Sequence, residues 1–180
     1  MRHPLHQRIG ELLGRASLGD CELVLDPACG GNQNIPLFVH DFKSNATEYC
    51  NVDALFHCDG QVRGIVEIEE ANIKPTQICG KFLTSALASF YHHEKHGNQP
   101  LPVRGAFFVQ VVDSSKLKKG KTSKLEQFRN IRESIRGLLT LGLDSVSSYE
   151  LVAIAGASDI EGIEKVIRYI EKSISELSGK

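Results

Sequence analysis

The residues best suited to chemistry in this 180-residue sequence are three acids at the end of an apolar strand. In the stretch VRGIVEIEE, Glu67, Glu69 and Glu70 follow a run of strand-forming residues. Asp53 lies seven residues before Gly60, and Glu67 lies seven residues after it. Close like charges repel each other, so a solvated strand end or a bound cation must offset the repulsion. Mg²⁺ prefers one or two carboxylates together with water and phosphate oxygens.

The turn between the two strands decides whether these carboxylates meet. An Asp-Gly sequence at positions 59–60, between two strand-like runs, is a strong hairpin signal because both residues tolerate positive φ. With a strict two-residue turn, Asp53 faces Val66 and is separated from Glu67. A three-residue loop, or a bulge at Gly64, sets Asp53 beside Glu67 instead. The sequence leaves both registers open.

Side-chain alternation divides the three acids between the two faces of the strand. Glu67 and Glu69 share one face, and Glu70 points to the other, where we expect it to be solvated. Glu67 and Glu69 together with Asp53 would place three carboxylates on one face, which favours a hard cation there. An exposed strand end, with Lys81 paired to one of the acids, would explain the same pattern without an ion.

The surrounding pattern predicts an α/β fold, with a mixed central β-sheet that contains a β-hairpin and is flanked by helices. Apolar spacing predicts helices over residues 3–15, 75–97 and 123–141, and from a cap at 158 or 159 to residue 177. Strand-like runs cover residues 21–28, 37–42, 51–57, 61–69, 105–112 and 149–157. At this length we expect a single domain, 1–180.

Composition and cysteine usage indicate an ordinary globular protein of a reducing compartment. The chain is 41% apolar and 24% charged, with a net charge of −1, and has no signal peptide or membrane-spanning run. We therefore expect a cytoplasmic protein with no membrane partner. The odd number of cysteines and the lack of a Cys-x-x-Cys pair argue against disulfides and structural zinc. These expected thiols are Cys21, Cys29, Cys50, Cys58 and Cys79.

One series of features runs from Asp53 through the hairpin to Glu67-Ile68-Glu69 and on to the following helix and strand. This series resembles the PD-(D/E)XK nuclease superfamily, which has the restriction-endonuclease-like fold. The resemblance covers residues 1–112 as a nuclease-like αβββαβ core and leaves residues 113–180 as an αβα extension. It implies an Mg²⁺- or Mn²⁺-dependent endonuclease that hydrolyses phosphodiester bonds of DNA, in restriction or repair. Members that cut both strands usually pair, so it also implies a homodimer.

The resemblance assigns metal ligands to three acids. Asp53 and Glu67 match the two motif acids and would hold the ion. Glu11, on the first predicted helix, resembles the acid that many members add to the metal site. The residue before Asp53 is Val52, where such families commonly have proline.

The main departure from the family lies at Glu69, which occupies the position of the motif lysine. Some members carry a second acid there, and others supply a lysine or glutamine from the next helix. Gln77 and Lys81 are four residues apart on that helix and share a face. The resemblance then implies that Lys81 replaces the missing charge, while Glu69 orients the attacking water or takes a second metal. The alternative is a catalytically inactive nuclease-fold protein that binds nucleic acid or a protein partner.

A basic arm between residues 113 and 136 predicts contacts to DNA phosphates. A lysine-rich loop precedes a helix whose arginines recur on one stripe. A merely solvated loop is the alternative interpretation. The predicted nucleic-acid-binding residues are Lys116, Lys118, Lys119, Lys121, Lys124, Arg129, Arg132 and Arg136.

Two other motifs have weaker functional interpretations. VLDPACGG resembles the first motif of adenine-type DNA methyltransferases, but its second glycine, Gly31, comes one position early and no Asn-Pro-Pro-Tyr-like motif follows. His92 and His96 lie four residues apart in a segment with helical spacing, which permits a metal pair.

Overall fold

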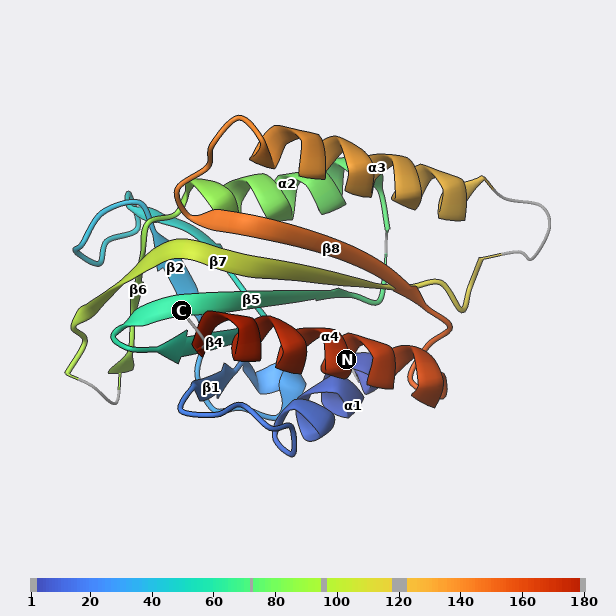
Figure 1. The fold of residues 1–180 in the computed structure, drawn as a ribbon, viewed down its shortest axis with the longest axis horizontal. Helices are drawn as coiled ribbons and strands as arrows, with labels where there is room; N and C mark the ends of the chain where they lie inside the picture. The colour runs from blue at the N-terminus through green and yellow to red at the C-terminus, as the bar shows by residue number, and fades with distance from the viewer. Residues whose placement is uncertain (1–2, 72, 95–96, 118–122, 179–180) are drawn as a thin grey trace.

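The computed structural model describes residues 3–71, 73–94, 97–117 and 123–178, and within them four helices flank a mixed eight-stranded sheet (Figure 1). The α/β fold class expected from the sequence is therefore confirmed. The helices are α1 (Pro4–Leu13), α2 (Pro75–Leu87), α3 (Lys124–Leu139) and α4 (Ile160–Ser178). The strands are β1 (Glu22–Leu25), β2 (Pro36–Phe38), β3 (Glu48–Asn51), β4 (Ala54–Cys58), β5 (Gln61–Glu69), β6 (Phe90–His92), β7 (Pro100–Asp113) and β8 (Val146–Ile154).

The sheet has an antiparallel part and a parallel part that meet at β5. β1, β4 and β5 pair antiparallel in that order, whereas β7 runs parallel to β5 and β8 runs parallel to β7. The helices α2 and α3 make the long connections that parallel neighbours require. The start of β7 also pairs with β6, which continues the sheet through β2 to β3.

Helices cover both faces of this sheet, α2 and α3 on one face and α1 and α4 on the other (Figure 1). Phe82 of α2 shares one buried cluster with Ile65 of β5. Ile9 of α1 shares a second buried cluster with Val66, the next residue along β5. Alternation along the strand therefore turns Glu67 toward α2. None of the helices in the described part of the chain is long and apolar enough to span a membrane.

The hairpin between β4 and β5 combines a two-residue turn with a bulge. Asp59 and Gly60 form the turn, with φ angles of 52° and 72°. The register then shifts at Arg63, which has no cross-strand partner in β4, and Ala54 pairs with Val66. The bulge lies one residue before the position expected from the sequence, and the shift selects the bulged register over the strict one.

The expectation of one helix over residues 75–97 is wrong for the residues after Leu87. α2 ends at Leu87, and Ala88 has extended backbone angles of φ −73° and ψ 144°. The next residues form β6, so His92 lies on a strand, and His96 falls outside the described residues. The β-forming aromatic pair Phe90-Tyr91 finds strand partners in β2 and β7, and this pairing outweighs the helical spacing.

A disulfide joins Cys21 to Cys58, so the expectation of thiols is wrong for these two residues. Cys21 precedes β1 and Cys58 ends β4, and the antiparallel register of the two strands brings them together. The two cysteines are 37 residues apart, and no local sequence pattern indicates that they pair. The expectation of thiols is confirmed for Cys29, Cys50 and Cys79.

The disulfide should contribute measurably to stability. Closing a loop of this length removes conformational entropy from the unfolded chain, so Cys21→Ser/Cys58→Ser should lower the free energy of unfolding by about 3–4 kcal/mol. Urea unfolding without reductant measures the difference, with Cys79→Ser at an exposed thiol as the matched control. Thiol titration of the unfolded, unreduced wild type should find three thiols; five would contradict the pairing.

Close packing next to the bulge makes a second stability prediction. A Cβ atom at Gly64 would overlap the ring of Phe107 on β7, whereas one at Gly137 of α3 has no heavy atom within 4 Å. Gly64→Ala should destabilise the protein by about 1–3 kcal/mol through overpacking. Gly137→Ala should stabilise it by about 0.5–1 kcal/mol, because alanine favours a helix. Equal unfolding midpoints for the two variants would contradict this packing of β5 against β7.

Candidate metal centre at the end of strand β5

Four of the predicted site residues meet where β5 faces α2. Lys81 Nζ lies 2.7 Å from Glu67 Oε2 and 3.0 Å from Glu69 Oε1. Gln77 Nε2 donates a hydrogen bond of 2.9 Å to Glu69 Oε2. Because Pro75 is suited to the first turn of a helix, α2 begins there and presents Gln77 and Lys81 on the face turned to β5.

Asp53, the residue directly before β4, completes the carboxylate group. The register that pairs Ala54 with Val66 puts Asp53 opposite Glu67. Its Oδ2 accepts a hydrogen bond of 2.6 Å from the backbone N–H of Ile68. Burial alone would raise the pKa of Asp53, but the hydrogen bond with His6 and nearby positive charge hold it below its ordinary value. Asp53 is therefore ionised at neutral pH.

Glu67 is the most deeply buried member of the group. Its exposed fraction is 0%, and burial, followed by the charge of Asp53, raises its pKa to about 8 despite the opposing effect of Lys81. Its Oε1 atom is buried and has no hydrogen-bond partner among the described residues. Such an orphaned oxygen costs free energy unless something binds it. A divalent cation held by Asp53 and Glu67 would satisfy this atom, so the donor set fits the Mg²⁺ or Mn²⁺ that the resemblance implies.

Sequence reasoning missed the part of the site contributed by α1. Glu70 Oε1 accepts hydrogen bonds from the backbone N–H groups of Leu5, at 2.6 Å, and His6, at 2.9 Å. The helix has no side-chain cap of its own, so Glu70 takes that role. Glu70 does point away from Glu67, but the expectation that it is solvated is wrong. Only the tertiary fold brings residues so far apart in sequence into contact.

His6 connects the α1 cap to the carboxylate group. Its Nδ1 lies 3.0 Å from Glu70 Oε1, and its Nε2 lies 3.6 Å from Asp53 Oδ2. Burial would lower the pKa of His6, but the bonds and charges of Asp53 and Glu70 raise it to about 9. His6 is therefore an imidazolium at neutral pH, with one acid on each side.

Glu11, the third acid predicted as a metal ligand, is not brought to this group. It is exposed and forms an ion pair of 3.2 Å with Arg8. At about 100° per residue, Glu11 lies roughly 140° around α1 from His6, the residue that reaches Asp53.

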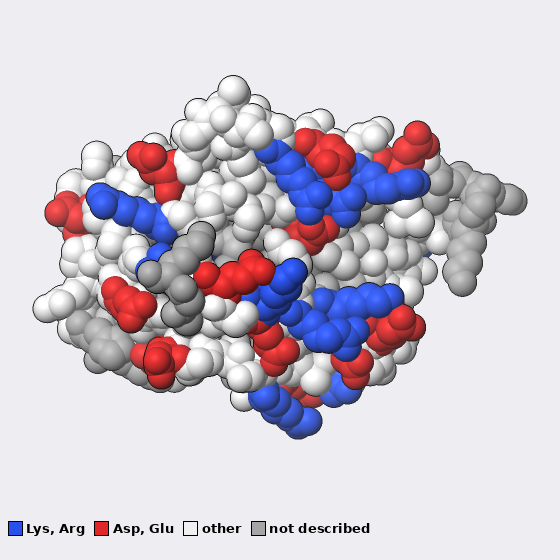
Figure 2. All heavy atoms as spheres, viewed as in Figure 1, with Lys and Arg blue, Asp and Glu red and all other residues white. Residues whose placement is uncertain are grey.

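The predicted basic arm is largely paired within the protein. Arg132 Nη1 lies 3.1 Å from Glu150 Oε1, and Arg136 forms an ion pair with the other oxygen of Glu150. Lys124 donates a hydrogen bond of 2.9 Å to Gln127 Oε1. Figure 2 shows basic and acidic side chains interspersed over α3 and α4 on the face in view. Two predicted residues, Lys116 and Arg129, are exposed, and three others, Lys118, Lys119 and Lys121, lie outside the described residues.

The glycines of VLDPACGG have a local structural explanation. Asp26 Oδ1 accepts a hydrogen bond of 2.8 Å from the backbone N–H of Cys29 and caps a short 3₁₀ helix, Pro27–Cys29. Gly30 ends that helix with a φ of 92°. A Cβ atom at Gly31 would overlap the carbonyl oxygen of Leu25. A tight turn against β1 therefore accounts for this sequence.

Comparisons of the chain with known protein families, with curated proteins and with solved structures find no match.

Lys81 should contribute to the free energy of unfolding because its positive charge offsets the buried carboxylates of Glu67 and Glu69. Lys81→Met leaves Glu67 and Glu69 buried without their cation, so we expect a loss of about 2–4 kcal/mol in the free energy of unfolding. Adding Glu67→Gln should recover at least about 1 kcal/mol of that loss. Lys165→Met, which removes an exposed ion pair with Glu161, is the matched control and should change stability by less than about 0.5 kcal/mol. Strictly additive effects of the Lys81 and Glu67 substitutions in urea unfolding would contradict the coupling.

Proposed function

We propose that this protein is an Mg²⁺- or Mn²⁺-dependent nuclease that hydrolyses phosphodiester bonds of DNA. The observation that carries the proposal is the cross-strand pair of Asp53 and Glu67, in which a buried oxygen of Glu67 is left without a hydrogen-bond partner among the described residues. A cation bound between the two carboxylates would give that oxygen a partner.

The order of elements supports the nuclease-like core of the proposal. α1, then the antiparallel strands β1, β4 and β5, then α2 and the parallel strand β7 follow the αβββαβ order that the PD-(D/E)XK resemblance implies. α3, β8 and α4 follow this core and form the αβα extension, whereas β2, β3 and β6 are further strands that the αβββαβ order does not include. Fold-level analogy raises the probability of this chemistry, but the argument for function rests on the site.

In the proposed reaction each residue has a separate role. Asp53 and Glu67 hold the cation, which when bound polarises the phosphate and lowers the pKa of a water molecule. Glu69 orients the attacking water as a hydrogen-bond acceptor. Lys81 stabilises negative charge on the phosphate in the transition state. Gln77 and His6 fix the orientation of Glu69 and Asp53 through the contacts described above.

The described basic residues differ in whether their charge is available to DNA phosphates. Arg132 and Arg136 already bind Glu150, so they would have to exchange partners to reach phosphates. Lys116 and Arg129 are exposed and remain the described candidates for backbone contacts. A homodimer belongs to the proposal by analogy with members that cut both strands. A cytoplasmic location belongs to it because the sequence has no signal-like or membrane-spanning apolar run. The Cys21–Cys58 disulfide is more typical of oxidising compartments.

The alternative function is a catalytically inactive nuclease-fold protein that binds nucleic acid or a protein. Two observations favour it: Glu69 stands in the position of the motif lysine, and Lys81 already neutralises Glu67 and Glu69 without a metal. Calorimetry with Mn²⁺ separates the two functions. Binding that disappears in Asp53→Asn supports the nuclease, and no binding that depends on Asp53 supports the inactive relative.

Activity provides the direct test of the nuclease. Asp53→Asn and Glu67→Gln should each lower Mn²⁺-dependent cleavage of plasmid DNA by at least about 100-fold, because each removes a charge that the reaction needs in place. Glu161→Gln, at an exposed acid of α4, is the matched control and should cleave as the wild type does. Circular dichroism of each variant checks that the fold is retained. Undiminished cleavage by both site variants would refute the proposal.

A further inference from the structure

A second group of metal-ligating side chains lies near the opposite end of β4 from Asp53. Glu22 of β1, His57 of β4 and His93, which directly follows β6, each offer a ligand atom, and these atoms all lie within 4.8 Å of one another. The antiparallel register makes Glu22 and His57 a cross-strand pair. Three separate segments of the fold thus converge here, and the site proposed above uses none of these residues.

The geometry of the group suits a small tetrahedral ion. His57 Nε2 lies 3.4 Å from Glu22 Oε2, and His93 Nε2 lies 3.4 Å from Glu22 Oε1. The two imidazole rings are 5.1 Å apart between centroids, with an angle of 81° between their planes. Ligands at about 2.0–2.1 Å from a tetrahedral Zn²⁺ are separated from each other by about 3.3–3.4 Å. A modest adjustment of the rings around Glu22 would therefore bring two nitrogens and one oxygen onto a common ion.

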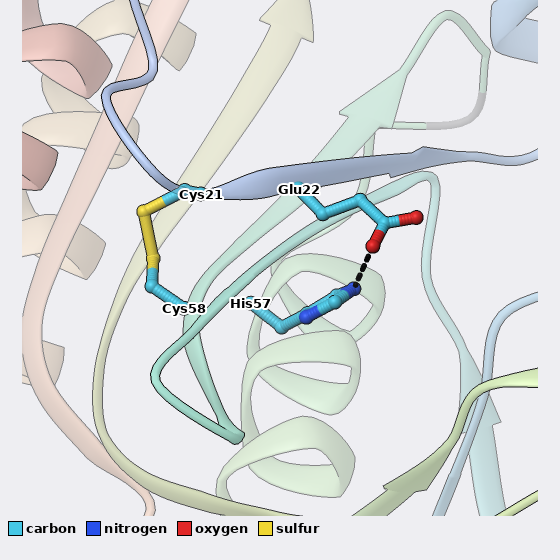
Figure 3. The surroundings of a disulfide bond; sticks show 4 residues. All are labelled: Cys21, Glu22, His57 and Cys58. Carbon is cyan, nitrogen blue, oxygen red and sulfur yellow. Dashed lines mark ion pairs between the residues drawn. A yellow bond between two sulfur atoms is a disulfide. The ribbon is translucent and has the colours of Figure 1, made fainter. Parts of the chain in front are cut away.

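Burial and rigidity support the same interpretation. His93 is almost completely buried, and the side chain of His57 is only 11% exposed. Figure 3 shows Glu22 and His57 pointing toward one another beside the disulfide, whose cysteines directly adjoin them in the sequence. The covalent link holds the two strands together at the position of the ligand pair. Little conformational entropy then remains to be lost when an ion binds.

One side of the group opens to solvent. The side chain of Glu22 is 42% exposed, and together with His93 it lines a surface pocket of about 180 Å³ that also contains Gln33 and Asn32. Two histidines and one glutamate are a ligand set that zinc sites use when the fourth position is left to water or a substrate. The pocket provides room for that fourth ligand.

We propose that Glu22, His57 and His93 form a binding site for a zinc-like divalent cation, with a fourth position that faces the pocket. Imidazole ligands favour Zn²⁺ and similar ions, whereas the carboxylates at Asp53 and Glu67 favour Mg²⁺ or Mn²⁺. The site is independent of the proposed nuclease function. His3, His6 and Glu70 also bring ligand atoms close together. Their contacts in the α1 cap and at Asp53 make them part of the candidate metal centre at the end of β5, not a separate site.

The test uses the oxidised, full-length chain in the background Glu67→Gln/Cys79→Ser. These two changes remove a competing carboxylate and an exposed thiol that would itself bind zinc. Calorimetry with Zn²⁺ should show one ion per chain, and Co²⁺ in its place should give the visible absorption of a tetrahedral site without a sulfur-to-metal band. A background protein that binds neither ion would overturn the proposal.

Ligand variants then locate the ion. His57→Gln and His93→Gln should each weaken Zn²⁺ binding by at least about 100-fold, since even the loss of a second-shell partner costs 10–100-fold. Glu22→Gln changes a side chain that is partly exposed, so it keeps the test valid if a buried histidine variant fails to fold. His40→Gln, at an exposed histidine, is the matched control and should bind as the background does. Binding that survives in the Glu22, His57 and His93 variants would place the ion elsewhere and refute the site.

Discussion

The burial of carboxylates at the end of β5 is the constraint on which this structure depends most. Removing a charge from water costs several kcal/mol unless cations or hydrogen-bond donors replace the solvent. Lys81 of α2 meets Glu67 and Glu69 on one face, and the amino terminus of α1 meets Glu70 on the other. The buried acids at this strand end therefore need contacts from the helices on both faces of the sheet. The orphaned oxygen of Glu67 is the part of this requirement that the described protein groups leave unmet, and the metal proposal follows from it.

Local signals in the sequence were enough for most of the helices and strands and for one half of the site. The Asp59-Gly60 turn forms as the pattern predicts, because the backbone angles it needs are local properties of those residues. The contact of Lys81 with the β5 acids follows from helical spacing once α2 is placed over the strand. The bulge at Arg63 remained one of two alternatives, because the packing of Gly64 against a strand forty residues away decides it.

Features that join distant segments could not be predicted in this way. The capping of α1 by Glu70 spans more than sixty residues, and the Cys21–Cys58 pair depends on the register of β1 with β4. β6 formed where helical spacing indicated a continued helix, since strand partners outweighed local preference. In each case, the energy that decides the outcome comes from a partner that the local sequence does not specify.

The two candidate metal centres differ in chemistry and lie apart along one strand. Asp53 and His57 are separated by about 13 Å along the extended chain of β4. Oxygen ligands at the first centre favour a hard cation, and imidazoles at the second favour zinc. Occupation of one centre should therefore leave the other available, so each can be examined with its own ion.

Anomalous diffraction from a crystal of the wild-type protein soaked in Mn²⁺ tests the central claim most directly. We predict a manganese peak within coordination distance of both Asp53 and Glu67, with Glu67 Oε1 as a ligand. Density that shows Lys81 still closing the site, with no manganese between Asp53 and Glu67, would contradict the account.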